Sequence, residues 1–560
     1  MSQHETGDMV KHFYRASAAD FMKISGSPVA YWIDKKTIKC FEDKKVGDYF
    51  FSDGVTKTGN NDKYLRYWWE VSLLAVKNYS RYRFHAKGGT ERPFYGNIDL
   101  LVKWDEISIR HYKRDHIARI TPEALWDKEG ITWSDITSGK NSFRILSQGE
   151  IAATAGPAIF KKDGGAELIL DAVGYLNTKI VEGFLDIINP TYHVNPNDVL
   201  NLPFRPGGTQ AREITKQLIE IYKSDWDRAE VSFKFSGINT SSSPGSKLES
   251  EILSDVQDDT EMRDRACMLI QKLNEIYAKV WGLDTVGNWQ FDDLNLAMPK
   301  TTKNSLVLNI ISYAVGSVMG RYSPDKPGLI LASQGETLRD FLREVPSLRF
   351  TPDDDAILPL TEQEWFTDDS TNRFHEFVQV VWGDDHLQEN LDFIAESLCL
   401  HAIKPKRGES ALDTIRRYLS TQFYKDHLRT YKKRPIYWLF SSGKHKAFEC
   451  LVYLHRYNKG TLARMRTEYV IPLSAKLNAY AEKLEQDKDA SNSAAETKRL
   501  EKEIATLHKQ QAELAEFDEK LRHYADQRIS LDLDDGVKVN YGKFGDLLAE
   551  VKAVTGEKAT

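Results

Sequence analysis

Residues 97–112 read NIDLLVKWDEISIRHY, and this stretch decides the fold class predicted for the first third of the chain. Asn97–Trp104 has the apolar composition of a short strand. Ile107–Tyr112 begins with the alternation of apolar and polar residues that a half-buried strand shows. Turns rich in Pro and Gly flank such segments. The sequence therefore predicts a domain of short strands here.

Further along the chain the apolar spacing changes to the helical period. Leu168–Ile188 is predicted to be a helix. Thr209 is a candidate N-cap for a second helix over Gln210–Lys223. A third helix is predicted over Ile252–Trp281, ending at Gly282. A helical spacer thus follows the strand-rich domain.

Near the C-terminus two helical patterns, Tyr469–Leu484 and Ala494–Arg528, are separated by the polar turn Asp487–Ser493. The second pattern places apolar residues at most positions of a coiled-coil seam. These residues are Leu500, Ile504, Leu507, Leu514, Leu521 and Ala525. We expect an antiparallel helical hairpin, which serves either as a docking arm or simply as packing.

The fold class predicted from these patterns is α+β, with a mixed, β-rich domain followed by largely helical domains and the C-terminal hairpin. Six segments are expected. They are a connecting segment at 1–40, the strand-rich domain at 41–205, a helical spacer at 206–300 with a mobile loop at 238–250, an α/β domain at 301–468, the hairpin at 469–530 and a tail at 531–560.

Composition excludes several classes of protein. The 560 residues hold 76 Lys and Arg against 82 Asp and Glu, so a uniformly basic, histone-like protein is excluded. The four cysteines form no CxxC pair, which predicts neither a zinc site nor a disulfide framework. The N-terminus lacks an apolar signal region, and no window approaches the ~20 apolar residues that cross a bilayer. A soluble cytoplasmic protein without a membrane partner is expected.

Charge is segregated in the second half of the chain. Residues 351–400 carry 13 acidic and 1 basic side chains, whereas residues 401–480 carry 17 basic and 5 acidic ones. The two segments either pair with each other or leave a basic surface for phosphates or partner proteins. The acidic run Asp353–Asp355 is interpreted as a solvated turn rather than a metal site.

A candidate nucleic-acid face lies in residues 61–120, which hold 12 Lys and Arg against 7 Asp and Glu, interleaved with aromatic residues. Basic side chains contact phosphates and guanine edges, while aromatic rings either build the core or stack on bases. The cations proposed for DNA contact are Lys63, Arg66, Arg81, Arg83, Lys87 and Arg92.

The tetrapeptide Asn189–Tyr192 reads NPTY and is similar to the [N/D]PP[Y/F] loop with which amino-methyltransferases hold a flipped base. An AdoMet site also needs a strand, a Gly-rich turn and a helix. The pairs Gly88-Gly89, Gly164-Gly165 and Gly207-Gly208 lack that context in the sequence. NPTY is therefore interpreted as a helix-terminating turn. No Walker A, HExxH, GxSxG or nuclease motif is present, so no catalytic, cofactor-binding or metal-binding residue is assigned.

A longer pattern carries a family resemblance. Residues 58–71, TGNNDKYLRYWWEV, resemble the TGDND-x-FLR-x-W-x-EV signature of the PglX family of BREX adenine-specific DNA methyltransferases. Similar blocks follow in order. They are Lys87–Asn97, Gly174–Lys179, Ile188–Thr191, Leu202-Pro203, Asp225–Asp227, Ile311–Thr337 and Phe423–Ser442. The likeness spans about residues 14–550.

The resemblance implies the C-terminal half of such an enzyme, with residues 41–205 as its target recognition domain. It implies a phage-defence protein that binds double-stranded DNA and directs N6-methylation of adenine in a short site. S-adenosyl-L-methionine (AdoMet) and the family's own NPPY loop are then expected in a catalytic half that this chain lacks. The expected partners are DNA, that methyltransferase half and other BREX components, and the chain alone is expected to be inactive.

The resemblance also implies that the turn at residues 59–61 lies near DNA. Gly and Asn accept positive φ, and Asn side chains bond adenine edges. The alternative is that both Asn residues only hold the turn through backbone hydrogen bonds. The candidate DNA-contact residues are Gly59, Asn60, Asn61, Lys63, Arg66, Arg81, Arg83, Lys87, Arg92, Lys432, Lys433 and Arg434. Two alternatives remain open, namely a complete methyltransferase with a cryptic AdoMet site and a scaffold for BREX proteins.

Overall fold

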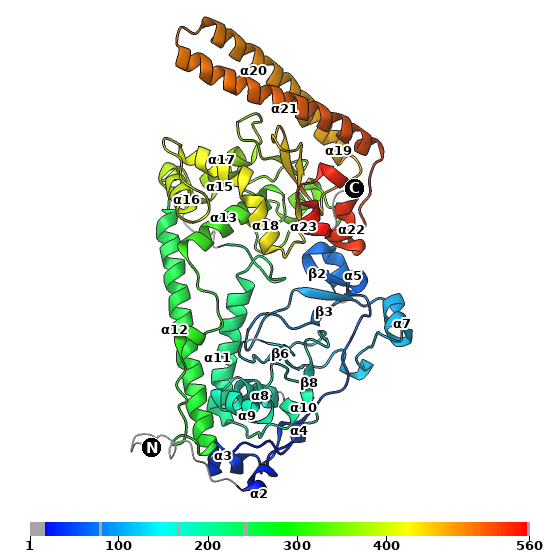
Figure 1. The fold of residues 1–560 in the computed structure, drawn as a ribbon, viewed down its shortest axis with the longest axis vertical. Coiled ribbons are helices and arrows are strands. Elements are labelled where there is room, and N and C mark those ends of the chain that lie inside the picture. Colours follow the sequence, from blue (N-terminus) through cyan, green and yellow to red (C-terminus); the bar gives the residue numbers. More distant parts are fainter. Residues whose placement is uncertain (1–16, 78–80, 138, 166, 239–244, 557–560) are drawn as a thin grey trace, which may run out of the picture. The chain divides into compact units, whose positions relative to one another are not determined.

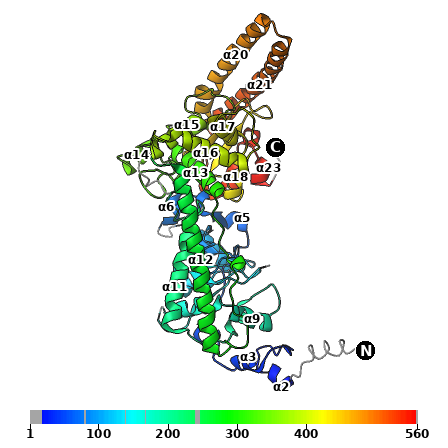
Figure 2. The same cartoon turned by 90° about the vertical axis from the view of Figure 1, so that its left-hand side faces the viewer.

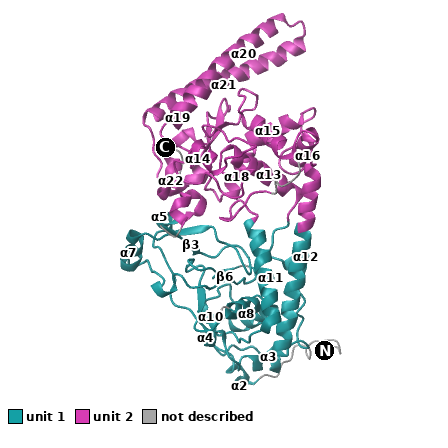
Figure 3. Ribbon diagram, turned by 180° about the vertical axis from the view of Figure 1, so that it is seen from behind, with its two compact units in different colours: residues 1–65, 79–227, 259–300 teal, residues 66–78, 228–258, 301–560 magenta. Residues whose placement is uncertain are grey.

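The structure is a computed structural model that describes residues 17–77, 81–137, 139–165, 167–238 and 245–556. Two compact units are present (Figure 3). Unit 1 comprises residues 1–65, 79–227 and 259–300, and unit 2 comprises residues 66–78, 228–258 and 301–560. Small antiparallel and mixed sheets accompany many helices in the described residues, so the α+β fold class is confirmed. The six-segment division stays a prediction.

Unit 1 contains two sheets. The first is antiparallel, with the order β1, β8, β5, β6. Its strands are β1 (Phe50–Phe51), β8 (Ala158–Lys161), β5 (Gly130–Thr132) and β6 (Arg144–Leu146). In the second sheet β3 pairs antiparallel with β4 and parallel with β7. These strands are β3 (Tyr82–Ala86), β4 (Leu100–Lys103) and β7 (Ile151–Ala152). The strand predicted over Asn97–Trp104 is confirmed as β4.

The short helices of unit 1 are α2 (Ala18–Phe21), α3 (Lys35–Cys40), α4 (Val46–Tyr49), α5 (Asn61–Tyr64) and α10 (Pro196–Leu200). The longer ones are α7 (Glu106–Arg114), α8 (Glu167–Leu176), α9 (Lys179–Ile188), α11 (Gly208–Asp227) and the C-terminal part of α12 (Leu248–Trp281). In unit 1, α11 and α12 run side by side (Figure 1, Figure 2). Both helices contribute to one apolar core, for example with Leu218 and Leu273.

The strand prediction for Ile107–Tyr112 is wrong, because these residues belong to α7. The Asp105 side chain accepts the backbone N–H of Ser108 at 2.8 Å and caps the helix. Ser108 and Tyr112, four residues apart, are each only 2% exposed. Burial at that spacing follows the helical period, which the short alternating pattern concealed.

The single helix predicted over Leu168–Ile188 is two helices, α8 and α9, because Asn177 and Thr178 interrupt the pattern. The Asn177 amide donates to the carbonyls of Phe143 at 2.8 Å and Val173 at 2.9 Å, and its oxygen accepts the N–H of Phe143. These bonds tie the helix junction to Phe143, directly before β6.

The other helix predictions of the spacer are confirmed. Helix α11 covers the predicted Gln210–Lys223 and extends beyond it at both ends. Because it begins at Gly208, Thr209 lies inside the helix, and the prediction of Thr209 as its N-cap is wrong. Helix α12 ends before Gly282, whose φ of 66° suits a residue that terminates a helix. It begins at Leu248, so the last residues of the predicted mobile loop 238–250 are helical. Residues 239–244 of that loop lie outside the described residues.

Unit 2 holds one antiparallel sheet with the order β10, β11, β9. Its strands are β10 (Tyr437–Ser441), β11 (Glu449–Tyr453) and β9 (Ile357–Pro359). Its helices include α6 (Leu73–Val76), α13 (Lys303–Val318), α14 (Leu338–Glu344), α15 (Ser370–Trp382), α16 (Leu387–His401), α17 (Ala411–Thr421), α18 (Phe423–Thr430), α19 (Thr461–Arg464), α22 (Gly536–Gly542) and α23 (Val551–Thr555). Strand β2 (Leu65–Tyr67) lies where the chain passes from unit 1 to unit 2.

The predicted helical hairpin is confirmed as α20 (Ile471–Ala490) and α21 (Ala494–Asp526), which lie side by side in orange in Figure 1. The facing side chains are buried apolar residues. They include Leu473, Leu477, Leu484, Leu500, Ile504, Leu507, Leu514 and Leu521. Helix α20 continues to Ala490, so the turn is shorter than the predicted Asp487–Ser493.

A matched pair of glycines tests the packing of unit 1. A Cβ on Gly174 of α8 would lie 2.2 Å from Oγ1 of Thr215 on α11, which is fully buried, whereas a Cβ on Gly183 of α9 would meet nothing within 4 Å. Gly174→Ala is expected to destabilise the fold by about 1–3 kcal/mol through overpacking. Gly183→Ala is expected to stabilise it by about 0.5–1 kcal/mol. Melting temperatures of the two variants should move in opposite directions; equal shifts would contradict the α8–α11 packing.

Candidate nucleic-acid interface

The turn at residues 58–62 is held by its own side chains. Gly59 has a φ of 74°, which favours glycine. The Asn60 side chain accepts the N–H of Lys63 at 3.0 Å and caps α5. The hydroxyl of Thr58 donates to the Asn61 side-chain oxygen at 2.8 Å. Of the two interpretations of these Asn residues, the structure supports the one in which they hold the turn.

This turn is fixed to helix α7. His111 donates from Nε2 to the carbonyl of Thr58 at 3.0 Å, and its ring stacks on Tyr64 with centroids 4.6 Å apart. The backbones of Lys57 and Arg119 exchange hydrogen bonds of 2.9 and 2.8 Å. We call residues 57–64 and 105–119 together the turn–helix surface. It is one rigid element of unit 1.

The turn–helix surface presents exposed cations that the sequence analysis missed. Its exposed Lys and Arg residues are Lys57, Lys63, Arg110, Lys113, Arg114 and Arg119. None of the six forms an ion pair with a residue of the described ranges. Only Lys63 was named from the sequence. The cations of α7 belong to the basic stretch 61–120 found from composition. A strand would place them on two opposite faces, whereas the helix places them on one side.

Two of the predicted DNA-contact residues in unit 1 have structural partners instead. Arg83 donates to the carbonyl of Trp126 at 2.9 Å and to the carboxylate of Asp127 at 2.7 Å. Arg92 forms a buried ion pair with Asp225, and its guanidinium lies 5.1 Å from the ring centroid of Trp226. A buried guanidinium needs such partners, so these two side chains hold the fold.

The remaining unit 1 candidates are Arg81 and Lys87. Arg81 is exposed just before β3. Lys87 is half-buried, and burial lowers the pKa of its ammonium group. It precedes Gly88, whose φ of 82° and close approach to the carbonyl of Ala155 fit only glycine. Lys87 therefore extends from a tightly constrained turn.

The predicted contact residues in unit 2 also include some that bind the fold itself and some that are exposed. Arg66 is 7% exposed and donates from Nη2 to the carbonyl of Asp534 at 2.8 Å. Arg434 donates to the carbonyls of Lys433 and Val554 at 3.0 and 3.3 Å. Lys432 and Lys433 are exposed, with φ of 52° and 59°. Of the four predicted contact residues in unit 2, two are thus exposed lysines.

The acidic and basic segments of unit 2 pair with each other. Arg416 forms a buried ion pair with Asp369. Arg464 lies 2.8 Å from a carboxylate oxygen of Asp354 and 3.4 Å from one of Asp355. Burial and the neighbouring Asp353 raise the pKa of Asp355 to about 8. These contacts account for part of the charge segregation without any nucleic acid.

The run Asp353–Asp355 forms a turn, as predicted, but it is not solvated throughout, because Asp353 is buried and the Asp355 side chain is 4% exposed. The Asp353 carboxylate accepts the backbone N–H groups of Asp355 at 3.0 Å and Ala356 at 2.8 Å. Within the described residues no cluster of His, Cys, Asp and Glu has the arrangement of a metal site. Ala356 follows in the left-handed region with a φ of 57°.

The NPTY segment terminates helix α9. The amide nitrogen of Asn189 donates to the carbonyl of His193 at 2.6 Å and to the carboxylate of Asp198 at 2.7 Å. Its oxygen accepts from the backbone and the hydroxyl of Thr191. Since the turn uses both ends of the amide, the interpretation of NPTY as a helix-terminating turn is confirmed.

Two glycine pairs do not form an AdoMet-type turn. Gly164-Gly165 lies between β8 and α8, but β8 pairs antiparallel with both of its neighbours, whereas dinucleotide turns follow parallel strands. Gly207-Gly208 leads into α11, and their backbone N–H groups lie near the carboxylate of Asp171 and favour its charged form. Burial raises the pKa of that carboxyl to about 6. The start of α11 is therefore occupied by the chain itself.

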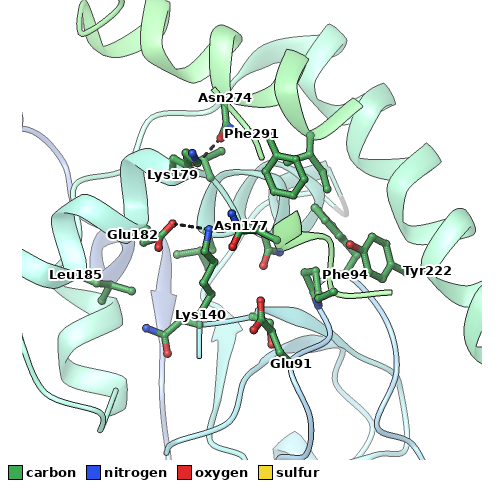
Figure 4. A pocket seen from close by; sticks show the side chains of 18 residues that line it. Glu91, Phe94, Lys140, Asn177, Lys179, Glu182, Leu185, Tyr222, Asn274 and Phe291 are labelled. Atoms are coloured by element: carbon green, nitrogen blue, oxygen red, sulfur yellow. Dashed lines mark hydrogen bonds and ion pairs between the residues drawn. The ribbon is translucent and has the colours of Figure 1, made fainter. Parts of the chain in front are cut away.

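A cavity of about 60 Å³ in unit 1 lies between helices α9, α11 and α12 and the segments at residues 91–94 and 140–142 (Figure 4). Three buried polar atoms on its lining residues have no hydrogen-bond partner, namely Oδ1 of Asn141, the hydroxyl of Tyr222 and Nδ2 of Asn274. An engineered cavity of about 150 Å³ binds benzene, a molecule much smaller than AdoMet. This cavity is too small for AdoMet and suits a few water molecules.

Comparison with known proteins adds the functional context. The chain is 42% identical over 558 residues to an "Adenine-specific methyltransferase BrxX" of Escherichia coli O9:H4 (strain HS), a match that covers 96% of this chain and 46% of that protein. The chain is homologous to part of an adenine-specific methyltransferase. It is also 33% identical over 563 residues to an "Adenine-specific methyltransferase PglX" of Lacticaseibacillus casei (strain Zhang), covering 95% of this chain and 45% of that protein.

The chain thus spans about half the length of the curated relatives it matches. No protein-family model matches it. Among the described residues, none of the helices combines the length and apolarity that a bilayer crossing requires. Neither match assigns a role to a particular side chain of this chain.

The Arg92–Asp225 pair gives a test that separates a structural role from DNA contact. Arg92→Ala would remove one side of a buried ion pair, which typically costs about 3–5 kcal/mol. Thermal unfolding should report this loss, and Asp225→Ala should reproduce it. The DNA affinity of the folded fraction should stay unchanged in both variants. If Arg92→Ala keeps its stability and loses DNA affinity, the structural role assigned to Arg92 is wrong.

Proposed function

We propose that this chain is the DNA-recognition portion of a BREX phage-defence adenine-N6 DNA methyltransferase. It binds double-stranded DNA and directs methylation that a separate catalytic half carries out with AdoMet. The observation that carries the proposal is the match of nearly the whole chain to about half of two adenine-specific methyltransferases. A folded portion of a methyltransferase that lacks the catalytic half is expected to supply DNA recognition or assembly. Further BREX components are expected partners.

Unit 1 supports the recognition role by its surface. The turn–helix surface holds six exposed Lys and Arg residues within a chain whose net charge is −6. Duplex DNA attracts such a local basic face because phosphate contacts release condensed counterions. The two buried arginines of unit 1, Arg92 and Arg144, are in no position to contribute. The exposed cations are therefore the side chains available to duplex DNA.

The salt dependence of DNA binding tests this proposal. Each phosphate contact contributes about −0.9 to the slope of log K against log salt, so contact by most of the six cations predicts a slope of about −3 to −5. Fluorescence anisotropy of a labelled duplex at increasing salt measures it. A duplex that is not bound at low salt, or an affinity that does not change with salt, would contradict a role in DNA recognition.

Methyl transfer by the chain alone provides the second test. We expect neither heat of AdoMet binding by calorimetry nor methylation of duplex DNA, because the chain supplies recognition only. Adding the catalytic half of a homologous methyltransferase as a separate polypeptide should restore methylation. One-to-one AdoMet binding by the chain alone would instead favour a complete enzyme. In that case Asn189→Ala would show whether NPTY takes part.

A further inference from the structure

Helix α7 has an exposed face with an unusual composition. Ile107, Arg110 and Arg114 stand at positions i, i+3 and i+7, which places them on the same side of a helix. Ile107 is 76% exposed, and both arginines are exposed. The face therefore offers one apolar side chain beside two guanidinium groups.

The opposite face of α7 is firmly anchored. Tyr112 is 2% exposed, and its hydroxyl donates to the carbonyl of Lys103 at 2.9 Å. It packs in one apolar cluster with Tyr64, Val102 and Trp104. Its ring meets that of Tyr64 edge-on, with centroids 5.3 Å apart. Because this face is locked, the outer face is presented in a fixed orientation, as a recognition element requires.

The charges around α7 leave its cations available. Two of the four acids on the turn–helix surface, Asp105 and Asp115, bind backbone N–H groups. Asp115 accepts those of Ile117 and Ala118, both at 2.8 Å. Glu106 lies in the first turn, where the helix dipole favours an acid. Arg110 and Arg114 make no ion pair within the described ranges, so their guanidinium groups can bind an external acceptor.

We propose that α7 reads base edges in the major groove of double-stranded DNA through Ile107, Arg110 and Arg114. The inference rests on the proposed function and names the residues that would carry its specificity. An α-helix fits the major groove, where arginine forms a bidentate contact with guanine and an apolar side chain meets the methyl group of thymine. Lys57, Lys63, Lys113 and Arg119 surround this face and contact phosphates, which position the helix without reading sequence.

A substitution that keeps charge separates base reading from phosphate contact. The double variant Arg110→Lys, Arg114→Lys retains both charges but loses the planar fork that matches guanine. The full chain is incubated with a pool of duplexes whose central positions are randomised, and bound DNA is sequenced. We expect the double variant to bind the pool with unchanged affinity and salt slope. Its enrichment of guanine-containing motifs should fall about tenfold or more for each lost contact.

Two single variants complete the design. Lys113→Ala should weaken binding to every duplex equally and reduce the magnitude of the salt slope by about 1, with the enriched motif unchanged. Ile107→Ala should relax the preference at a thymine position alone. Ile117→Ala, which removes a 47% exposed apolar residue outside the proposed reading face, is the matched control and should leave the motif intact.

The outcomes are distinguishable. If wild-type protein binds DNA but the Arg110→Lys, Arg114→Lys variant enriches the same motif to the same degree, α7 does not read bases while the proposed function stands. Enrichment of no motif by the wild-type chain would also overturn base reading by α7. If the wild-type chain binds no duplex at all, the proposed function itself fails.

Discussion

Acceptors within the fold hold several buried guanidinium groups, and this leaves other cations of the chain to face outward. Arg92 is paired with Asp225, Arg416 with Asp369, and Arg66 with the carbonyl of Asp534. Each of these contacts joins segments distant in the sequence, so the buried arginines brace the two units internally. What remains for an external polyanion is the set of cations that the fold leaves outside, and in unit 1 six of them lie on one turn and one helix.

Periodicity explains which parts of the fold were predictable from the sequence. The hairpin α20–α21 and helix α12 repeat their apolar spacing over many turns, and Gly282 ends α12 as predicted. Residues 107–112 are too few to separate a period of 2 from one of 3.6, and the capping bond from Asp105 decides for a helix. Leu168–Ile188 forms two helices instead of one because Asn177 bonds to Phe143. No local pattern in the sequence predicts this contact.

The candidate site shows a similar division. Composition located the basic stretch 61–120, and Lys63 does lie on the turn–helix surface. Composition did not distinguish Arg92, which is buried, from Arg110, which is exposed, because both count equally. For the NPTY segment a local sequence likeness suggested a role that the contacts do not support. Its likeness to a base-holding loop is local, whereas the bonds of Asn189 to His193 and Asp198 show it to be a turn. Only the three-dimensional contacts assign such residues.

The most direct test of the account is chemical protection of arginine side chains by DNA. The full chain is treated with an arginine-specific dicarbonyl reagent with and without excess duplex, and modified peptides are quantified by mass spectrometry. The account predicts strong modification of Arg110 and Arg114 in the unbound protein and protection of both by DNA, while Arg92 and Arg416 stay unmodified in either state. Protection confined to other exposed arginines, with Arg110 and Arg114 modified equally in both states, would contradict it.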